Sequence, residues 1–322
     1  MRYLVTGGTG FVGAYVVEAL VNANHEVTLF DIAPNRQFLK EVVGLDDSKV
    51  RILSGDVTDA FAVLKAMRES GAQRVIHLAA MLGHLCDINP IRALRVNAEG
   101  TLNIFEAALE CSVEKVVWAS TIGVFGTFGQ SKEGGAQVFG NDSPHRPQGV
   151  YGACKSFCEN VARLYERQRG LDAIGLRFSM AYGYGKALTA QRGTRVGFIA
   201  DLVDGPALGQ PTTIANGDSN LDWVYVGDAA RSAVLASESL KTKEVAVNIT
   251  GERYTIREVA GVVKKLLPDA QLKVEDGSWG YDLVFDATAA EREIGYRPTT
   301  SIENGIRQNI NKVRVANNLK PI

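Results

Sequence analysis

A glycine-rich turn near the amino terminus constrains the fold more than any other feature of this 322-residue chain. An apolar, β-branched run at residues 3–6 leads directly into glycines at positions 7, 10 and 13, and a helical pattern opens at Phe11. Gly7 permits a tight turn, Gly10 lets the backbone approach a phosphate, and Gly13 lets the helix pack closely on the strand. Strand, spacing and helix agree, so the turn predicts a dinucleotide site with its pyrophosphate at the helix N-terminus. We expect contacts from Gly7, Gly10, Phe11, Val12 and Gly13.

Strand-like and helical patterns alternate through the first 180 residues, as is typical of βαβ units that build a parallel sheet. The expected strands are 3–6, 26–30, 51–53, 74–78, 115–119 and 173–178, with helices such as 11–21, 60–69 and 89–109. We predict an α/β fold: a doubly wound Rossmann domain over residues 1–180 and a smaller C-terminal α/β substrate-binding domain over 181–322, some of whose segments return to the first domain. The ligand should lie outside the carboxyl ends of the strands, where the strand order reverses.

The later residues show a looser pattern. Residues 182–220 are rich in Gly, Pro, Thr and Asn and predict irregular connections around one helix at 196–203. Beyond them we expect strands at 222–226 and 245–249 and helices at 228–240, 256–267 and 302–315.

Composition excludes several functional classes. The 35 basic and 36 acidic residues give a net charge of −1, which offers no attraction to nucleic acid or to an anionic membrane. No apolar run approaches the roughly 18 to 20 residues that span a bilayer, and no signal-peptide pattern opens the chain, so we expect a cytoplasmic protein. The four cysteines form no Cys-x-x-Cys pair, so we expect neither a disulfide framework nor a metal site. A small molecule is the expected partner.

Asp31, at the end of the second expected strand, points to the identity of the dinucleotide. A carboxylate there accepts hydrogen bonds from the adenosine ribose and repels the additional phosphate of NADP, so we predict NAD. Arg36 lies close by in the sequence, but a loop arginine is more often simply solvated. Two further groups of residues could flank the cofactor or could serve only to pack the strand ends. They are Asp56 and Val57 after the third strand, and Leu78, Ala79 and Ala80 after the fourth.

Tyr151 and Lys155 are four residues apart on an expected helix, which puts both on one face. A tyrosine with an ordinary pKa of about 10 is a poor base at neutral pH, and a nearby ammonium lowers that pKa by favouring the phenolate. Ser120 and Thr121 end the fifth strand, where we expect both hydroxyls to reach the same crevice. We predict that Thr121 orients a substrate oxygen while Tyr151 transfers its proton and hydride passes to or from nicotinamide.

Taken together, these motifs resemble the extended short-chain dehydrogenase/reductase family, which includes NAD-dependent sugar epimerases and dehydratases and the 3β-hydroxysteroid dehydrogenases. The resemblance extends through 5–13, Asp31, 77–80, Val96 and Asn97, 120–121, 151–155, 176–178, 224–228 and 294–298. It implies that Tyr151 is the acid/base, Lys155 its partner and Thr121 the orienting hydroxyl, with Asn97 supporting the site. It also implies a homodimer, formed through the helices that begin near Asn89 and Tyr151.

Several positions depart from the nucleotide-sugar enzymes of that family. Met180 stands where they carry an asparagine near the substrate pyrophosphate, Leu221 stands where they often carry an arginine, and residues 277–282 lack a further arginine. The loss of these groups removes charge-assisted hydrogen bonds to a diphosphate, which disfavours a standard UDP-sugar. Arg192 and Arg195 could form another clamp, unless they are ordinary solvated arginines. The substrate site is therefore expected to include Met81, Ser120, Ser179, Arg192 and Arg195.

Two loops bear on the reaction type. Ile122 and Gly123 replace the Asp-Glu pair that sugar-nucleotide 4,6-dehydratases use as acid and base, so dehydration is disfavoured. Residues 125–147 form a longer stretch than usual, which is either a lid over the substrate or a tolerated surface loop.

The leading hypothesis is NAD-dependent hydride transfer at a secondary alcohol of a sugar-like or nucleotide-sugar substrate, which ends in oxidation or in epimerisation. The alternatives are oxidation of a bulky apolar alcohol, as in 3β-hydroxysteroid dehydrogenases, and a catalytically silent NAD sensor. The same active-site residues serve oxidation and epimerisation, so they leave the outcome and the substrate open.

Overall fold

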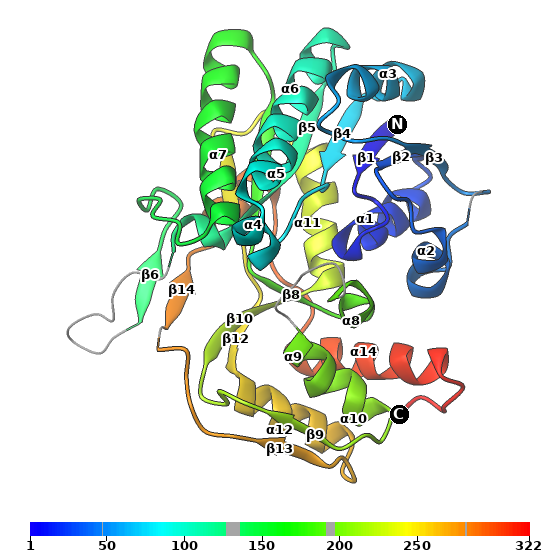
Figure 1. The fold of residues 1–322 in the computed structure, drawn as a ribbon, viewed down its shortest axis with the longest axis vertical. Helices are drawn as coiled ribbons and strands as arrows, with labels where there is room; N and C mark the ends of the chain where they lie inside the picture. The colour runs from blue at the N-terminus through cyan, green and yellow to red at the C-terminus, as the bar shows by residue number, and fades with distance from the viewer. Residues whose placement is uncertain (47, 127–135, 191–196, 281) are drawn as a thin grey trace.

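The computed structural model describes residues 1–46, 48–126, 136–190, 197–280 and 282–322, and a seven-stranded sheet of parallel pairs lies at its centre (Figure 1). Its strands are β1 (Arg2–Thr6), β2 (Glu26–Asp31), β3 (Arg51–Ser54), β4 (Arg74–His77), β5 (Lys115–Thr121), β7 (Ala173–Phe178) and β11 (Ala246–Ile249). Their order is β11-β7-β5-β4-β1-β2-β3, so the strand order reverses between β1 and β4. The predicted doubly wound α/β fold is confirmed, and the reversal marks the crevice where such sheets bind ligands.

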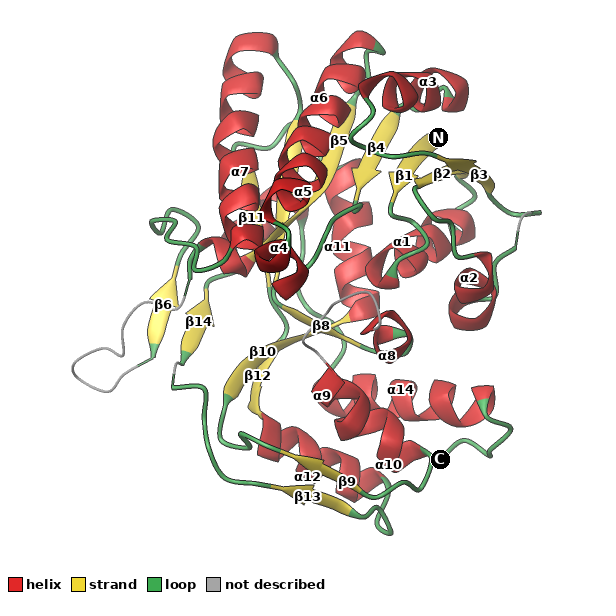
Figure 2. Cartoon of the chain, in the orientation of Figure 1, coloured by secondary structure: helices red, strands yellow, loops and turns green. Residues whose placement is uncertain are grey.

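Helices cover both faces of this sheet (Figure 2). The first core is formed with α1 (Phe11–Asn22) and α11 (Val226–Glu238), and the second with α3 (Ala60–Ser70), α6 (Gly100–Glu110) and α7 (Val150–Arg169). Successive strand residues alternate between the two: Val5 and Ile76 belong to the first core, Leu4 and Val75 to the second. Strands buried on both faces explain why the strand segments read as nearly continuous apolar runs.

Local sequence explains where the helices begin and end. Asp59 accepts hydrogen bonds from two backbone amides in the first turn of α3, and Gly71 ends that helix in the left-handed region at φ 55°. Thr255 and Glu258 form a capping box at the start of α12 (Ile256–Leu266). In contrast, α1 begins at Gly10 with no side-chain cap.

The helix expected at 89–109 is not uniform. Its first part is α5 (Pro90–Leu94), preceded by α4 (His84–Ile88), and a π-helical turn, Arg95–Glu99, separates α5 from α6. Such a turn holds one residue more than a regular α-helical turn and is often found at functional sites. Apolar periodicity does not reveal this insertion.

The chain after residue 180 contributes to two parts of the molecule. The first part is the seven-stranded sheet with the helices that cover it, and the second part contains the smaller sheets described below. Residues 226–249 return to the first part, because α11 packs on α1 and β11 joins the seven-stranded sheet. The second part contains the sheet of β8 (Met180–Tyr182), β10 (Asn220–Tyr225) and β12 (Glu252–Thr255), and the pair β9 (Thr212–Ile214) and β13 (Leu272–Val274). Its helices are α8 (Lys186–Ala190), α9 (Gly197–Ile199), α10 (Gly205–Ala207), α12 and α14 (Ile302–Ala316), with a π-helical turn at Ala200–Asp204; α13 (Thr288–Ile294) contacts α11 and β11. No helix among the described residues is long and apolar enough to cross a membrane.

Part of the expected lid forms a small parallel sheet: β6 (Gln137–Phe139) pairs with β14 (Leu283–Phe285). Phe125, Phe139 and Phe285 stack together with interplanar angles of 22° to 24°. This stack joins the segment after β5 to two distant parts of the sequence. Residues 127–135, within the expected lid, lie outside the described residues.

Candidate active site

The glycine turn between β1 and α1 lies tightly against the end of β4. Gly7 has a φ of 68°, and a Cβ there would lie 2.6 Å from the backbone nitrogen of Ala79. A Cβ on Gly13 would lie 2.2 Å from the Gly7 carbonyl oxygen, so any side chain would separate the helix from the turn. Gly7 and Gly13 therefore do need to be glycine. The uncapped N-terminus of α1 offers the backbone amides and partial positive charge that suit a phosphate.

Asp31 is held at the end of β2 by two hydrogen bonds. Its Oδ2 accepts from the Thr9 hydroxyl at 2.5 Å and its Oδ1 from the Ala33 backbone amide at 3.2 Å. Thr9 belongs to the glycine turn, so the carboxylate and the turn form one surface. The side chain of Asp31 is thus fixed beside the glycine turn, and its contact with a ribose stays a prediction.

The other residues expected around the cofactor have structural contacts of their own. Asp56 accepts a hydrogen bond from the Thr58 amide at 2.9 Å. Val57 packs closely against Gly100, because a Cβ on Gly100 would lie 2.7 Å from a Val57 methyl group. Leu78 continues the pairing of β4 with β1 through the Thr6 carbonyl. Ala79 lies against Gly7. Ala80 is half-buried. These contacts agree with the packing interpretation and leave a role in cofactor binding open.

His77 connects Thr6, directly before the glycine turn, to Thr101 of α6. The Ala79 amide donates to the Thr6 hydroxyl at 3.2 Å, and that hydroxyl lies 2.6 Å from His77 Nδ1. His77 Nε2 lies 3.2 Å from the Thr101 hydroxyl, which donates to the Asn97 carbonyl at 2.8 Å. Because the Thr101 hydroxyl proton is already directed at Asn97, His77 donates at Nε2 and accepts at Nδ1. Burial lowers the pKa of His77 to about 3, which keeps this arrangement neutral.

Asn97, in the π-helical turn, fixes the loop after β4. Its Oδ1 accepts from the Met81 amide at 3.0 Å, and its Nδ2 donates to the Met81 carbonyl at 2.9 Å. Its own carbonyl also accepts from the Cys158 thiol, at 3.2 Å. Asn97 thus ties Met81 to α7, which is the supporting position implied by the family resemblance. The role in substrate binding expected for Met81 stays a prediction.

Tyr151 and Lys155 occupy one face of the first turns of α7. Lys155 is fully buried, and its Nζ lies 5.8 Å from the centroid of the Tyr151 ring. This Nζ has no hydrogen-bond partner among the described residues. A buried ammonium without a partner is costly, so its place suggests a group that arrives with a ligand.

The pKa values of this pair differ from the sequence-based expectation. Burial raises the pKa of Tyr151 well above its ordinary value, and the neighbouring Cys86 and Cys158 thiols act in the same direction. Burial also lowers the pKa of Lys155. The expected lowering of the Tyr151 pKa by Lys155 is therefore not observed, because removal from water destabilises both the phenolate and the ammonium.

Thr121 and Ser120 end β5 but face opposite sides of the sheet. The Thr121 hydroxyl accepts from the Gly123 amide at 3.1 Å, at the start of the short 3₁₀ helix Ile122–Val124. A Cβ on Gly152 would lie 2.5 Å from the Gly123 carbonyl oxygen, so α7 abuts this turn next to Tyr151. Thr121 and Tyr151 are therefore brought to the same end of the sheet.

Ser120 is not placed as expected. Its buried hydroxyl donates to Glu159 Oε1 at 2.6 Å, beneath the crevice. Successive residues of a strand point to opposite faces, so the Ser120 and Thr121 side chains point to opposite sides of the sheet. The role in substrate binding expected for Ser120 stays a prediction.

Sequence reasoning missed a buried ion pair beneath the site. Arg177 donates to both oxygens of Glu159, with distances of 2.7 to 3.1 Å, and also to Asn141. His145 Nε2 lies 3.3 Å from Glu159 Oε2. The network joins α7, β7 and the segment after β6. The spacing of Tyr151, Lys155 and Glu159 along one helical face was the available signal.

The structure describes some of the residues that were expected to bind the substrate, but not Arg192 or Arg195. Ser179 donates to the buried carboxylate of Asp222, so its hydroxyl is already engaged. Met180 starts β8 beside Trp223, and Leu221 is buried in the core of the second part. Arg192 and Arg195 lie outside the described residues. The described positions thus show no arginine where Leu221 stands and no asparagine at Met180.

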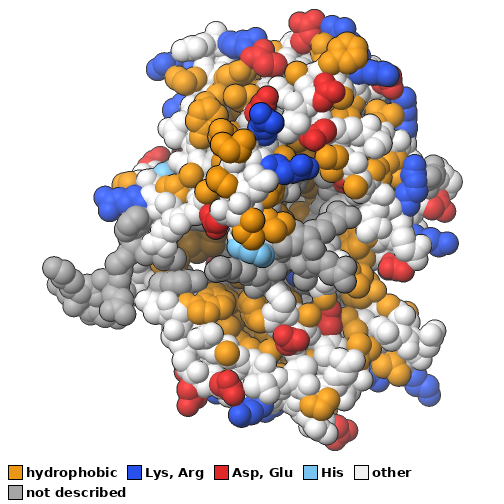
Figure 3. Space-filling view, in the orientation of Figure 1, with side chains coloured by type: hydrophobic (Ala, Val, Ile, Leu, Met, Phe, Trp, Pro, Cys, Tyr) orange, Lys and Arg blue, Asp and Glu red, His pale blue; other side chains and the backbone are white. Residues whose placement is uncertain are grey.

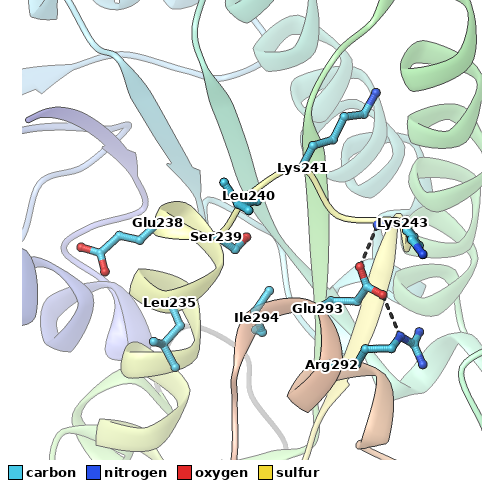
Figure 4. A pocket seen from close by; sticks show the side chains of 9 residues that line it. All are labelled: Leu235, Glu238, Ser239, Leu240, Lys241, Lys243, Arg292, Glu293 and Ile294. Atoms are coloured by element: carbon cyan, nitrogen blue, oxygen red, sulfur yellow. Dashed lines mark hydrogen bonds and ion pairs between the residues drawn. The ribbon is translucent and has the colours of Figure 1, made fainter.

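A surface hollow of about 510 Å³ lies elsewhere, between the end of α11 and α13 (Figure 4). It is lined by residues 235–243, which precede β11 and so lie towards the amino end of that strand, and by three residues of α13, Arg292, Glu293 and Ile294. Glu293 accepts hydrogen bonds there from the Lys243 amide and from Arg292. The polar groups of Glu293 and Arg292 are already paired, and the hollow is separate from Tyr151.

The chain is similar to known proteins over most of its length. The model of the NAD dependent epimerase/dehydratase family matches residues 3–250. UDP-glucuronate 4-epimerase 3 of Arabidopsis thaliana is 26% identical, over 95% of this chain and 74% of that protein. UDP-glucuronic acid decarboxylase 6 of the same plant is also 26% identical, over 95% of this chain and 87% of that protein.

Solved structures match over nearly the whole chain. The UDP-glucose 4-epimerase of Thermus thermophilus, crystallised with NAD, has a TM-score of 0.81 at 28% identity and covers 98% of this chain and 99% of its own. The UDP-glucose 4-epimerase of Thermotoga maritima, at 23% identity over 98% of this chain and 99% of its own, has a TM-score of 0.84 and supports the fold. The family model spans well over half of the sequence. The chain therefore belongs to the NAD-dependent epimerase/dehydratase family and is an enzyme of the extended short-chain dehydrogenase/reductase type.

Proposed function

We propose that the protein transfers hydride between NAD and a secondary alcohol of a sugar-like substrate, with Tyr151 as the acid/base. The observation that carries this proposal is the buried Lys155 Nζ, which has no partner among the described residues and lies 5.8 Å from the Tyr151 ring centroid. A structural lysine would be paired, as Lys115 is with Asp172 and two backbone carbonyls. Lys155 is therefore suited to ribose hydroxyls of a bound nucleotide.

The residues around the crevice fit NAD. The glycine turn and the N-terminus of α1 would hold its pyrophosphate, Asp31 its adenosine ribose, and Lys155 its nicotinamide ribose. The Asp31 carboxylate is fixed by Thr9 and Ala33, so it would exclude a 2′-phosphate by charge. When bound, NAD supplies the hydride acceptor and, in an epimerisation, returns the hydride to the other face of the substrate.

Each catalytic side chain has a distinct task. Tyr151 removes the hydroxyl proton as hydride leaves the carbon, and gives it back in the reverse step. Because burial favours the neutral phenol, the Tyr151 phenolate depends on the Lys155 ammonium within the same enclosed site. Thr121 holds the substrate oxygen in line with Tyr151. Ser120, Glu159 and Arg177 position α7 and do not touch the substrate.

The chemistry of the relatives supports a nucleotide-sugar or sugar-like substrate. The similar proteins are named as 4-epimerases and a decarboxylase of UDP-linked sugars. Ile122 and Gly123 still disfavour dehydration, since neither residue can act as an acid or base.

One observation favours a second candidate, oxidation of a bulky apolar alcohol. Leu221, at the position where nucleotide-sugar enzymes often carry an arginine, is buried with a side chain that cannot contact a phosphate. Met180 likewise offers no hydrogen bond to a phosphate. A catalytically silent NAD sensor remains the third hypothesis, and it is opposed by the joint presence of Thr121, Tyr151 and Lys155.

A turnover assay tests these functions. Purified enzyme is given NAD and a panel of sugars, uronic acids, nucleotide sugars and sterols, while NADH absorbance and product isomers are followed. Accumulation of NADH with one substrate identifies a dehydrogenase, and an isomer without net NADH identifies an epimerase. Tyr151→Phe should lower turnover by about 10² to 10⁴-fold and leave NAD affinity unchanged. Full activity of this variant would refute the role of Tyr151, and a wild type that binds NAD without converting any substrate would favour the sensor.

A further inference from the structure

Lys186 brings a positive charge to the start of α1 from a distant part of the chain. It is the first residue of α8, and its Nζ lies 5.0 Å from the centroid of the Phe11 ring. Phe11 is the first residue of α1, directly after the glycine turn. Figure 1 shows α8 next to α1, below the carboxyl ends of the strands.

The turn that carries Lys186 is built to hold this position. The Tyr15 hydroxyl of α1 donates to the Tyr184 carbonyl at 3.0 Å, and the Lys186 amide donates to the Gly183 carbonyl at 3.2 Å. Gly183 and Gly185 have φ angles of 140° and 94°, which ordinary side chains rarely adopt. A Cβ on Gly185 would lie 3.1 Å from the rings and methyls of α2 (Arg36–Val43). The placement of Lys186 is therefore fixed by contacts to two helices.

The Lys186 ammonium has no counter-charge in the described parts of the chain. No ion pair or side-chain hydrogen bond involves its Nζ there, and its contact is the face of the Phe11 ring. Burial lowers the pKa of Lys186 to about 8, and no acidic group opposes that effect. Lys115, by comparison, is held by Asp172 and by two carbonyl oxygens. Lys186 is half-buried, and an ammonium partly removed from water without such partners is stabilised where a ligand supplies the anion.

The same place already carries the partial positive charge of a helix end. The α1 helix is twelve residues long, and no side chain caps its N-terminus at Gly10. An ammonium and a helix N-terminus repel each other, and an anion between them satisfies both. A phosphate, with its several acceptor oxygens, has the required charge and shape.

We propose that Lys186 binds a phosphate oxygen at the N-terminus of α1, from the diphosphate of the cofactor or from a phosphorylated substrate beside it. The inference rests on the proposed function for its choice of ligands and not for its geometry. In the second case Lys186 would restore, from another strand end, the positive charge that Leu221 lacks.

Binding measurements on Lys186→Met, Lys186→Arg and the wild type test the proposal. The control is Lys264→Met, which removes an exposed lysine of α12. Calorimetry gives the Kd of NAD, of adenosine as a phosphate-free probe, and of UDP on NAD-saturated enzyme. Thermal unfolding verifies that each variant is folded. Because no turnover is measured, failure of the proposed reaction would leave this test intact.

One outcome is that Lys186→Met raises the Kd of NAD by about ten-fold or more, that Lys186→Arg restores it and that the Kd of adenosine does not change. This result identifies the cofactor diphosphate as the ligand of Lys186. The same loss for UDP with unchanged NAD affinity assigns a substrate phosphate. Unchanged affinities for both ligands would overturn the proposal. An equal loss for adenosine would also overturn it, since that result shows a general disturbance of the site. If UDP does not bind the wild type, the NAD measurement alone decides.

Discussion

The Ser120 hydroxyl lies 2.6 Å from Glu159 Oε1, on the side of β5 opposite to the Thr121 side chain. Two adjacent hydroxyls thus have different tasks, and substitutions can separate them. Thr121→Ala should lower kcat/KM by about 10²-fold, because a hydrogen bond to the reacting oxygen is lost. Ser120→Ala should leave kcat nearly unchanged and lower the free energy of unfolding by about 1 to 3 kcal/mol, because Glu159 loses a buried partner. Steady-state kinetics and chemical denaturation measure the two effects, and the reverse pattern would exchange the roles assigned here.

Asp31 should set the preference for NAD over NADP. Asp31→Ser removes the carboxylate that would repel a 2′-phosphate, so NAD should bind more weakly and NADP more strongly, and the ratio of their affinities should change by about ten-fold or more. Titration with each cofactor gives this ratio. Thr9→Val serves as the control, since it removes the hydrogen bond to Asp31 and keeps the charge. A ratio that changes equally in both variants would show that geometry, and not charge, determines the preference.

Asp204 should make stability depend on pH. Burial raises the pKa of Asp204 to about 7, although Asn309 Nδ2 donates a hydrogen bond to its Oδ1 at 3.1 Å. The unfolded group releases its proton near pH 4 and the folded group near pH 7. Between these values the folded protein binds more protons, so its stability falls as pH rises through this range and levels off above it.

Asp204→Asn should remove that dependence. The variant should match the wild type near pH 4 and exceed it at pH 8, by an amount on the order of a few kcal/mol, because no carboxylate must then be buried as an anion. Denaturation curves at both pH values measure the difference. Equal destabilisation at the two pH values would mean that Asp204 contributes through packing or hydrogen bonding alone.

Apolar side chains exposed on α5 and α7 are expected to form a dimer contact. Ile91 is 65% exposed and Phe157 is 46% exposed, and hydrophobic surface gathers over these helices in Figure 3. Monomers rarely leave large adjoining apolar surfaces uncovered. Phe157→Glu should therefore produce a monomer in sedimentation equilibrium. Leu240→Glu is the control, since Leu240 is 90% exposed and follows the end of α11, outside α5 and α7. A wild-type monomer would refute the expected homodimer.

The sheet could be predicted because its information is local. Apolar runs, glycine spacing and helical periodicity specified the turn at Gly7 and the six strands that the first 180 residues contribute to the seven-stranded sheet. The strand at 245–249 was expected too, but its pairing with β7 was not. That pairing joins residues about 70 positions apart in the sequence, and no local pattern encodes such a contact. The π-helical turn at Asn97 was missed for a related reason, since one inserted residue barely changes the apolar pattern.

The site was predictable where chemistry requires fixed spacing along one element. Tyr151 and Lys155 share a helical face, and the glycines share a turn. The hydrogen bond of Ser120 to Glu159 was not foreseen, because it joins β5 to a residue of α7 that is distant in the sequence. The buried pair of Glu159 and Arg177 joins elements that meet only after folding, and the covered position of Lys186 arises in the same way.

The π-helical turn Arg95–Glu99 also determines how two surfaces are oriented relative to each other. Each residue of a helix advances the rotation by about 100°, so deletion of one residue there would turn α5 by that angle relative to α6. The exposed apolar side chains of α5 would then point away from their present direction, and Asn97 would leave Met81. One inserted residue in this helix therefore determines both the direction of the exposed apolar side chains of α5 and the hydrogen bonds that hold the loop after β4.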